Sequence, residues 1–349
     1  MNTTEHLRRS TGQLFMVGLP DKTLDKATLR LIREEYVGNF ILFRRNVQDH
    51  CKLWHLCRDL QDACANNKMP PPLIAIDQEG GSVTRLPPPF TQFSSARDRA
   101  TAPDPHLEIV SYSRLCAADL TLMGINVNFA PVLDVATEGE GYYLTNRTLG
   151  NNPAYVAELG ALTIKELEAH GVAACAKHFP GLGAAREDPH SRLPVISRAR
   201  EDLLAIDLVP FRAAISVGVA SMMTSHSIYI ALDREHPATF SASILTDLLR
   251  KECGYAGLLI TDDLEMGAID QADGLAGATL SSFLAGADLL LICHDQEKAL
   301  KVKTMIIKAC MDGQIPEERL AESLSRLAAV KKRFPFIRSD EEKVWQRFT

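Results

Sequence analysis

The sequence predicts an α/β fold of the (β/α)8 TIM-barrel type in a single domain. Short apolar runs of strand length recur along the chain, and each is followed by polar or Gly/Pro residues and then by a longer segment with helical periodicity. The runs are continuously apolar with polar residues only at their ends, which is typical of parallel strands covered by helices. Eight such runs occur, at 13–19, 39–43, 72–77, 127–135, 173–178, 220–226, 257–263 and 288–294.

Amphipathic segments of helical length lie between these runs. The expected helices span 24–35, 51–66, 107–123, 153–170, 200–217, 242–253 and 270–285, followed by two terminal helices at 296–311 and 317–334. An open, doubly wound sheet is the competing architecture, because a count of βα units does not exclude it. Eight units favour the closed barrel. We expect the barrel domain to span 1–340 and a polar tail to follow at 341–349.

Composition indicates a compact protein with a small-molecule ligand. The 349 residues are 46% hydrophobic and 23% charged, which provides ample apolar surface to bury. The formal net charge of −6 argues against nucleic acid or an anionic membrane as a partner, because both reward clustered Lys and Arg. The apolar run at 14–19 is too short for a signal peptide, and no run approaches the ~20 residues of a membrane span.

Cysteines and glycines can indicate metal sites and phosphate-binding loops, respectively. Eight cysteines are scattered without a CxxC pair, and most sit in apolar runs, so we interpret them as reduced core residues of a cytoplasmic protein. A zinc site needs closer Cys/His spacing, so no metal is expected. The Gly-rich segments at 77–82 and 177–183 match neither phosphate-binding loop pattern, which makes nucleotide binding an unfavourable interpretation.

Polar residues cluster at the carboxyl ends of the predicted strands. In a barrel these ends converge on one face, and that face carries the active site of barrel enzymes. A single polar residue there is ordinarily a turn or helix-capping residue, so the argument rests on the recurrence over seven strands. The residues are Arg44, Arg45, Asn46, Asp77, Gln78, Glu79, Asp134, Lys177, His178, His226, Asp262, Asp263 and His294.

Several motifs on these strands carry a resemblance to a known family. They are IDQEGGSVTRL (76–86), NFAPVLDV (128–135), NRTLG (146–150), KHFPGLG (177–183), DPHSRLP (188–194), PFR (210–212) and ITDDLEMGAI (260–269). Together and in this order they resemble glycoside hydrolase family 3, and within it the single-domain bacterial β-N-acetylhexosaminidase branch of cell-wall recycling. The resemblance extends over about residues 10 to 335.

The resemblance implies a retaining exo-β-N-acetylglucosaminidase without cofactor or metal. Asp262 matches the nucleophile, and Asp188 and His190 match an acid/base dyad on a loop after the fifth strand. The sugar-binding positions of the family match Asp77, Arg85, Arg147, Lys177 and His178. The implied substrate is a small carbohydrate, N-acetylglucosamine β-linked to (anhydro)N-acetylmuramic acid or its peptides, and we expect a monomer.

Elementary chemistry agrees with these roles. A retaining glycosidase needs a carboxylate that attacks the anomeric carbon and a second group that protonates the leaving oxygen and then deprotonates water. A histidine has a suitable pKa, and Asp188 can orient the His190 ring. Asp263 is the candidate for capping the turn, whereas Lys177 and Arg147 have the alternative role of neutralising a buried carboxylate.

Two departures from the family pattern and three rival functions stay open. Leu182 stands where the family usually has His, and Pro189 where Ser is more usual, which leaves the behaviour of this loop open. The rivals are a phosphorylase of β-N-acetylglucosaminides or β-glucosides, a hydrolase of another β-glycoside on the same scaffold, and a sugar-binding protein without catalysis.

Overall fold

Eight parallel strands form the centre of the molecule. The computed structural model describes residues 3–137, 142, 144, 146–186, 193–267 and 274–348. Each of the eight predicted apolar runs contains one strand, so these predictions are confirmed. The strands are β1 (Phe15–Gly18), β2 (Asn39–Leu42), β3 (Leu73–Ile76), β4 (Val127–Asn128), β5 (Ala173–Phe179), β7 (Ser221–Thr224), β10 (Leu258–Ile260) and β11 (Leu290–Ile292).

The strands close into a barrel. Their order is β10-β7-β5-β4-β3-β2-β1-β11, and every paired register within it is parallel. The two ends of this order meet, because Ile260 forms a parallel bridge with Leu289 and the Thr261 amide donates to the Leu289 carbonyl at 3.0 Å. The predicted (β/α)8 barrel is therefore confirmed, and the open-sheet alternative is excluded.

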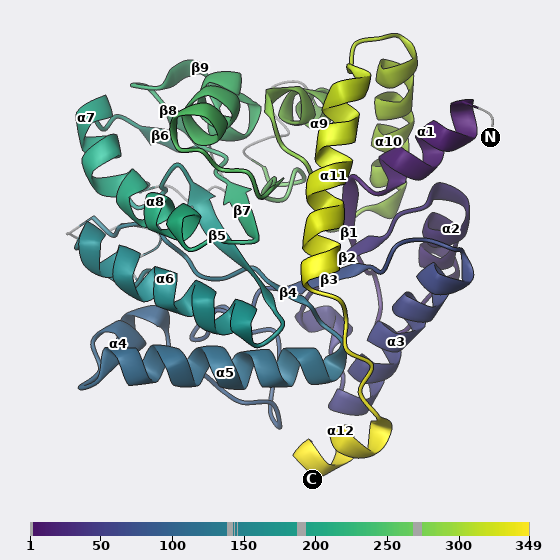
Figure 1. Cartoon of the computed structure of the whole chain (residues 1–349), viewed down its shortest axis with the longest axis horizontal. Helices are drawn as coiled ribbons and strands as arrows, with labels where there is room; N and C mark the ends of the chain where they lie inside the picture. Colours follow the sequence, from purple (N-terminus) through teal and green to yellow (C-terminus); the bar gives the residue numbers. More distant parts are fainter. Residues whose placement is uncertain are drawn as a thin grey trace.

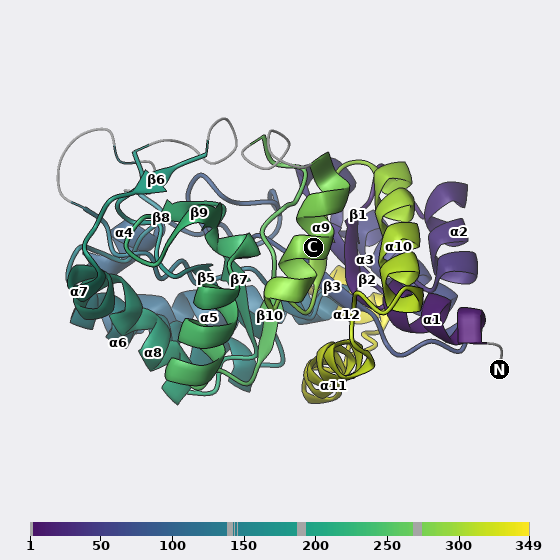
Figure 2. The ribbon, with the colours of Figure 1, turned by 90° about the horizontal axis from the view of Figure 1, so that it is seen from above.

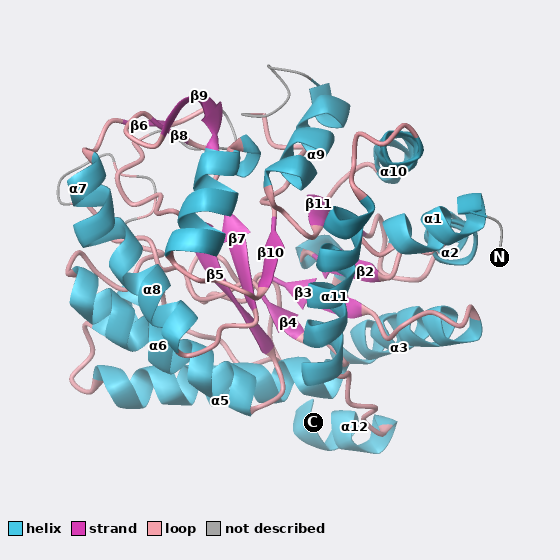
Figure 3. Cartoon of the chain, turned by 45° about the horizontal axis from the view of Figure 1, so that its top comes forward, coloured by secondary structure: helices cyan, strands magenta, loops and turns pink. Residues whose placement is uncertain are grey.

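Helices surround the barrel (Figure 1; coloured by secondary structure in Figure 3). Each predicted helical segment contains a helix, and residues 270–273 of the segment 270–285 lie outside the described residues. Several of these helices begin with an Asp or Asn side chain that accepts a first-turn amide. The α-helices are α1 (Thr3–Gly12), α2 (Lys26–Glu35), α3 (His50–Asn66), α4 (Ala96–Ala100), α5 (Pro105–Met123), α6 (Pro153–Ala169), α7 (Arg200–Asp202), α8 (Leu208–Ser216), α9 (Gly274–Ala285), α10 (Gln296–Met311), α11 (Glu317–Arg333) and α12 (Glu341–Phe348). The π-helical segments are η2 (Leu203–Asp207) and η4 (Ser243–Glu252), and the 3-10 turns are η1 (Arg44–Asn46) and η3 (Ala238–Phe240).

Several elements were not predicted from the sequence, among them the helices α1 and α4, a small second sheet and a carboxyl-terminal helix. A small sheet of β6 (Val195–Ile196), β8 (Ile228–Tyr229) and β9 (Asp233–Pro237) lies on the side of the molecule opposite to α11 (Figure 2). The segment 341–349, expected as a polar tail, forms α12 over 341–348 and packs against α3 and α5. Val344 is buried beneath it, and Arg347 bonds Asp119 at 3.0 Å. One buried aliphatic residue in eight is too weak a pattern to identify a helix from sequence.

Side chains alternate between two apolar layers along each strand. Met16 points into the barrel, whereas its neighbours Phe15 and Val17 belong to the layer between strands and helices. Leu327 and Val330 of α11 pack onto the interior cluster, so α11 closes the amino-terminal end of the barrel. All eight cysteines are free thiols, and five of them are buried. No helix among the described residues is long and apolar enough to cross a membrane.

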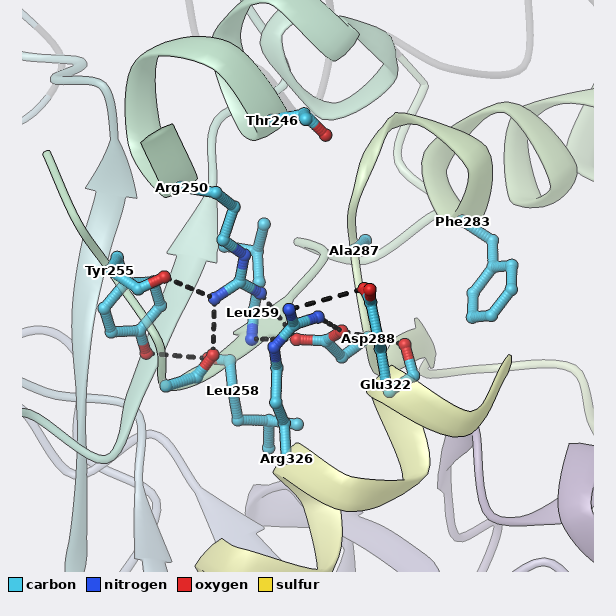
Figure 4. Close-up of polar contacts among 12 residues, drawn as sticks. Thr246, Arg250, Tyr255, Leu258, Leu259, Phe283, Ala287, Asp288, Glu322 and Arg326 are labelled. Atoms are coloured by element: carbon cyan, nitrogen blue, oxygen red, sulfur yellow. Dashed lines mark hydrogen bonds and ion pairs between the residues drawn. The ribbon is translucent and has the colours of Figure 1, made fainter. Parts of the chain in front are cut away.

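Asp288 stabilises the contact between β10 and β11, where the barrel closes (Figure 4). It lies between α9 and β11, and its side chain is inaccessible to solvent. The carboxylate accepts the Leu259 amide at 3.0 Å, and the Asp288 amide donates to the Leu259 carbonyl at 2.8 Å. The same carboxylate receives Nη2 of Arg250 at 2.6 Å and Nη1 of Arg326 at 3.0 Å. A single acidic residue therefore joins β10, β11, η4 and α11.

Candidate active site

The carboxyl ends of the strands enclose a pocket of about 340 Å³. Six of the residues predicted from sequence to form the site line it: Asp77, Arg85, Arg147, Lys177, His178 and Asp262. The other lining residues include Phe43, Leu182, Asp263, Glu265 and His294. The two remaining predicted residues, Asp188 and His190, lie outside the described residues. Residues more than 180 positions apart in the chain thus meet at one end of the barrel.

Lys177 is the centre of the charge network in the pocket. It lies near the carboxyl end of β5 with only 2% of its side chain exposed, and its Nζ lies 2.9 Å from Asp77 Oδ1 and 2.7 Å from Glu79 Oε1. Burial alone would lower the pKa of Lys177, but the two carboxylates outweigh burial and raise it. Lys177 is therefore a permanent cation that holds one oxygen of Asp77 in a fixed position.

Glu79 is a site residue to which the sequence analysis gave no role. Its carboxylate receives Nε of Arg147 at 2.9 Å and Nη2 of Arg147 at 2.8 Å, in addition to Lys177. Burial would raise the pKa of Glu79, but Lys177 and Arg147 hold that pKa well below its usual range. Lys177 and Arg147 therefore both neutralise a buried carboxylate, which is the alternative role that the sequence analysis considered for them.

The turn after β3 brings Glu79 inward. Gly80 follows it with φ of +96°, and a Cβ atom there would lie 2.4 Å from the Ser94 carbonyl oxygen, so only glycine fits. The motif Asp-Gln-Glu-Gly-Gly therefore places two carboxylates, Asp77 and Glu79, on the same lysine. Sequence analysis can find Glu79 by this pattern, in which two acidic residues lie two positions apart and directly precede a pair of glycines.

We expect Glu79→Gln to lower kcat/KM for the substrate by about 10- to 100-fold, mainly through KM. The amide leaves Lys177 and Arg147 without their shared anion, so both cations reorient toward Asp77 and the pocket. Steady-state kinetics with an aryl glycoside measures this effect, and circular dichroism checks folding. Glu34→Gln is the matched control, because Glu34 forms an exposed ion pair with Arg30 on α2. Equal kinetics for the Glu79 variant and the wild type would contradict this role.

Arg85 and Phe43 form the wall beside Asp77. Arg85 Nη2 lies 3.5 Å from Asp77 Oδ2, and the guanidinium lies 5.7 Å from the centre of the Phe43 ring. The Phe43 ring stacks on His294 with centroids 5.9 Å apart. This wall places the Phe43 and His294 rings beside the charged residues of the pocket, and aromatic rings can contact the carbon face of a sugar ring.

His178 is oriented by a buried carboxylate. Its Nδ1 lies 2.8 Å from Asp134 Oδ2, and the Asp134 side chain is fully buried. Because a carboxylate oxygen accepts, Nδ1 carries the proton and Nε2 stays available to the pocket. Asp134 also accepts a hydrogen bond from the Leu182 amide at 2.6 Å. This bond holds the backbone of Leu182, an apolar residue that lines the pocket.

Asp262 and Asp263 follow β10 and have different partners. The Asp263 carboxylate accepts the amides of Glu265 and Cys293 at 3.1 and 3.2 Å and pairs with His294 at 3.3 Å, so it caps the turn. Asp262 accepts only the Asp263 amide, at 2.8 Å, among the hydrogen bonds of the described residues. Its other oxygen is therefore available to a ligand in the pocket.

The charge states of the two carboxyl groups differ as well. Burial raises the pKa of Asp262, but His226, His178, the Asp263 amide and Lys177 outweigh burial and lower it overall. Burial and the neighbouring Asp262 charge raise the pKa of Asp263 to about 6. Asp262 consequently has the lower pKa of the two carboxyl groups and is ionised at neutral pH, which is the state a nucleophile requires.

His226 supports this turn from below. Its Nε2 lies 3.0 Å from the Asp263 carbonyl oxygen, and its Nδ1 lies 2.7 Å from Thr239 Oγ1. The ring is buried and contacts the turn through the backbone, so it positions Asp262 and Asp263. Within the part of the chain that the structure describes, no cluster of three His, Cys, Asp or Glu residues could hold a metal ion.

Comparison with known proteins agrees with this site. The model of the glycosyl hydrolase family 3 N-terminal domain matches residues 6–330. A β-hexosaminidase of Nitrosomonas eutropha is 33% identical over 339 residues, covering 94% of this chain and 95% of the relative. β-Hexosaminidase A of Pseudoalteromonas piscicida is 33% identical over 335 residues, which cover 90% of this chain but only 56% of that longer relative.

Solved structures give the same result. A family 3 β-N-acetylglucosaminidase from Paenibacillus sp. str. FPU-7 superimposes with a TM-score of 0.92 at 34% identity, over 98% of this chain and 68% of that one. A β-N-acetylhexosaminidase from Beutenbergia cavernae gives a TM-score of 0.86 at 30% identity, over 93% and 98% of the two chains. Because the family model matches residues 6–330 of the 349-residue chain, the chain belongs to glycoside hydrolase family 3.

Proposed function

We propose that this protein is a retaining exo-β-N-acetylglucosaminidase that removes terminal β-linked N-acetylglucosamine. The observation that carries the proposal is the pocket itself, in which Asp262, Asp77, Lys177 and His178 converge from three strand ends. The names of the relatives, β-hexosaminidases and β-N-acetylglucosaminidases, support this sugar. A volume of about 340 Å³ suits one sugar residue, as an exo-acting enzyme requires.

In the first step, the ionised Asp262 attacks the anomeric carbon and forms a covalent glycosyl ester while the bond to the leaving oxygen breaks. Asp262 lies in the pocket wall, and its lowered pKa keeps it ionised. Asp77, Arg85, Arg147, Lys177 and His178 bind the sugar, with Asp77 held by the Lys177 ammonium as hydroxyl acceptor.

His190, oriented by Asp188, protonates the leaving oxygen and then removes a proton from the attacking water. The described chain that precedes these residues favours this position. Leu182 lines the pocket, so the segment that contains the dyad begins within a few residues of the pocket wall. Water then attacks the glycosyl ester, which releases N-acetylglucosamine and regenerates the Asp262 carboxylate.

The natural substrate that we propose is N-acetylglucosamine linked to (anhydro)N-acetylmuramic acid in peptidoglycan fragments. The enzyme would act as a cytoplasmic monomer. Eight free cysteines support a reducing compartment. The test is to incubate purified protein with this disaccharide and with a panel of aryl β-glycosides, with and without phosphate. Release of free N-acetylglucosamine supports the proposal, whereas release of a sugar 1-phosphate identifies a phosphorylase instead.

We expect His190→Ala to lower kcat/KM for an unactivated disaccharide by about 10²- to 10⁴-fold. The loss is expected to be much smaller for a 2,4-dinitrophenyl glycoside, because that leaving group departs without protonation. Kinetics with both substrates measures the difference. His106→Ala is the matched control, since His106 lies exposed on α5 in contact with Glu158. Equal losses on both substrates would contradict the assignment of His190 as the acid.

A further inference from the structure

A second cavity lies at the amino-terminal end of the barrel, away from the proposed active site. It has a volume of about 530 Å³, and its lining surface is almost entirely carbon. One side is a single face of α11, which crosses this end of the barrel (Figure 1). The lining residues are Gln13, Pro70, Pro71, Leu324, Leu327, Ala328, Lys331, Lys332 and Pro335. We call this cavity the basal cavity.

Lys331 lines the basal cavity, and its amine is buried beside it. Only 6% of the residue is exposed, yet its Nζ bonds two neutral acceptors, Gln13 Oε1 at 2.9 Å and the Gly38 carbonyl oxygen at 3.3 Å. Among the described residues, no carboxylate lies within the 4.0 Å of an ion pair from this Nζ. The positive charge of Lys331 is therefore not compensated by a carboxylate of the described protein. A buried ammonium without a counter-ion is energetically costly.

The surroundings of Lys331 add no negative charge. The other buried lysines of the chain, Lys177 and Lys303, each have a carboxylate within 2.9 Å, which makes Lys331 the exception among the described residues. Lys332 adds a second positive charge at the rim of the cavity. Burial lowers the pKa of Lys331 to about 7, with the Cys64 thiol on α3 acting in the opposite direction. An anion that enters the cavity would therefore meet a cation that lacks its partner.

We propose that the basal cavity binds a free small monocarboxylate with an apolar chain, whose carboxylate pairs with Lys331 and whose chain covers the α11 face. Charge complementarity selects the carboxylate, and the carbon lining selects the chain. The volume lies within the range of small-molecule sites. The walls are fixed, because Asn126 Nδ2 donates to the Pro72 and Phe334 carbonyls at 3.2 and 3.0 Å and so ties α11 to β3.

The proposal predicts a distinct order of affinities for eight-carbon probes. At pH 6.5, calorimetric titration should show octanoate binding at least tenfold more tightly than octan-1-ol, and octylamine should not bind. Octanoate affinity should fall between pH 7 and pH 9, because Lys331 loses its proton over this range. Octan-1-ol affinity should stay constant, since its binding depends on the carbon lining alone.

Two variants locate the binding. Lys331→Met keeps an unbranched side chain and should weaken octanoate at least tenfold while leaving octan-1-ol unchanged. Ala328→Trp fills the cavity from the exposed side of α11 and should abolish binding of both probes. Lys308→Met, on the exposed surface of α10, removes one positive charge elsewhere and is the matched control. Absence of octanoate binding, equal affinity for octan-1-ol, or unchanged binding by Lys331→Met would each overturn the proposal, and so would dimerisation through this face.

Discussion

Replacing Asp262 by Gly should lower kcat/KM for an aryl β-N-acetylglucosaminide by about 10⁴-fold or more, which corresponds to about 5.5 kcal/mol in the activation barrier. The reason is geometric and electrostatic. Asp262 lies in the pocket wall with one oxygen unoccupied by the described protein groups, and His226, His178, the Asp263 amide and Lys177 outweigh burial and lower its pKa. Without the carboxylate, no group remains to form the glycosyl ester or to stabilise the positive charge of the transition state.

Azide should restore part of the activity of this variant. It fits the space left by the carboxylate, attacks the anomeric carbon from the same side, and yields the α-glycosyl azide, which nuclear magnetic resonance identifies. A slow fluorinated substrate should label the wild-type protein at Asp262, as peptide mass spectrometry can show. Absence of both rescue and label would remove Asp262 from the role of nucleophile.

Asp263→Asn is the matched control for Asp262. Asp263 is the adjacent carboxyl group, but the Glu265 and Cys293 amides occupy one of its oxygens and His294 lies near the other. The amide oxygen of Asn can still accept the two backbone bonds, so the turn should persist. We expect a loss of less than tenfold in kcat/KM. A loss as large as that of Asp262→Gly would show that the two carboxyl groups have been assigned in the wrong order.

The barrel could be predicted from sequence because its signal is repeated and local. The strands are mostly apolar on both faces, and Met16 between Phe15 and Val17 illustrates why: one face packs inside the barrel and the other beneath helices. The small sheet of β6, β8 and β9 escaped prediction, because β6 and β8 have only two residues each and the five residues of β9 are mostly polar and exposed. The helix α12 was missed for a similar reason, since Val344 is its one buried residue.

The polar residues of the site show a comparable division. Asp77, Lys177 and Asp262 could be identified because each lies at or just after the carboxyl end of a strand in a recognisable motif. Glu79 could not be given a role, because its importance depends on the distance from its oxygens to Lys177 and Arg147, residues 98 and 68 positions away in the chain. The positions of these residues in the sequence do not reveal how close their side chains lie in space. The same applies to Lys331, whose missing counter-ion becomes visible only when α11 lies on the barrel.

The largest stability effect that we expect is that of Asp288→Ala, with a loss of about 3–5 kcal/mol in the free energy of unfolding. Asp288 is fully buried, and its carboxylate lies within 3.5 Å of guanidinium nitrogens of Arg250, Arg319 and Arg326. Removing it leaves these cations facing one another in a buried position. It also leaves the Leu259 amide and the Ser323 hydroxyl without an acceptor.

Urea denaturation followed by circular dichroism measures this loss, and Asp247→Ala provides the comparison. Asp247 also pairs with a cation, Lys251 at 2.8 Å, but on the exposed face of η4, where water replaces the lost contact at little cost. Should Asp288→Ala not fold, Asp288→Asn keeps an acceptor for the Leu259 amide and isolates the loss of charge. If Asp288→Ala unfolds at the same urea concentration as Asp247→Ala, the arginines find other partners and closure of the barrel depends on the strand ladder alone. The structure argues against that outcome, because β10 and β11 are joined through a single parallel bridge, and the Asp288 carboxylate lies directly beside it.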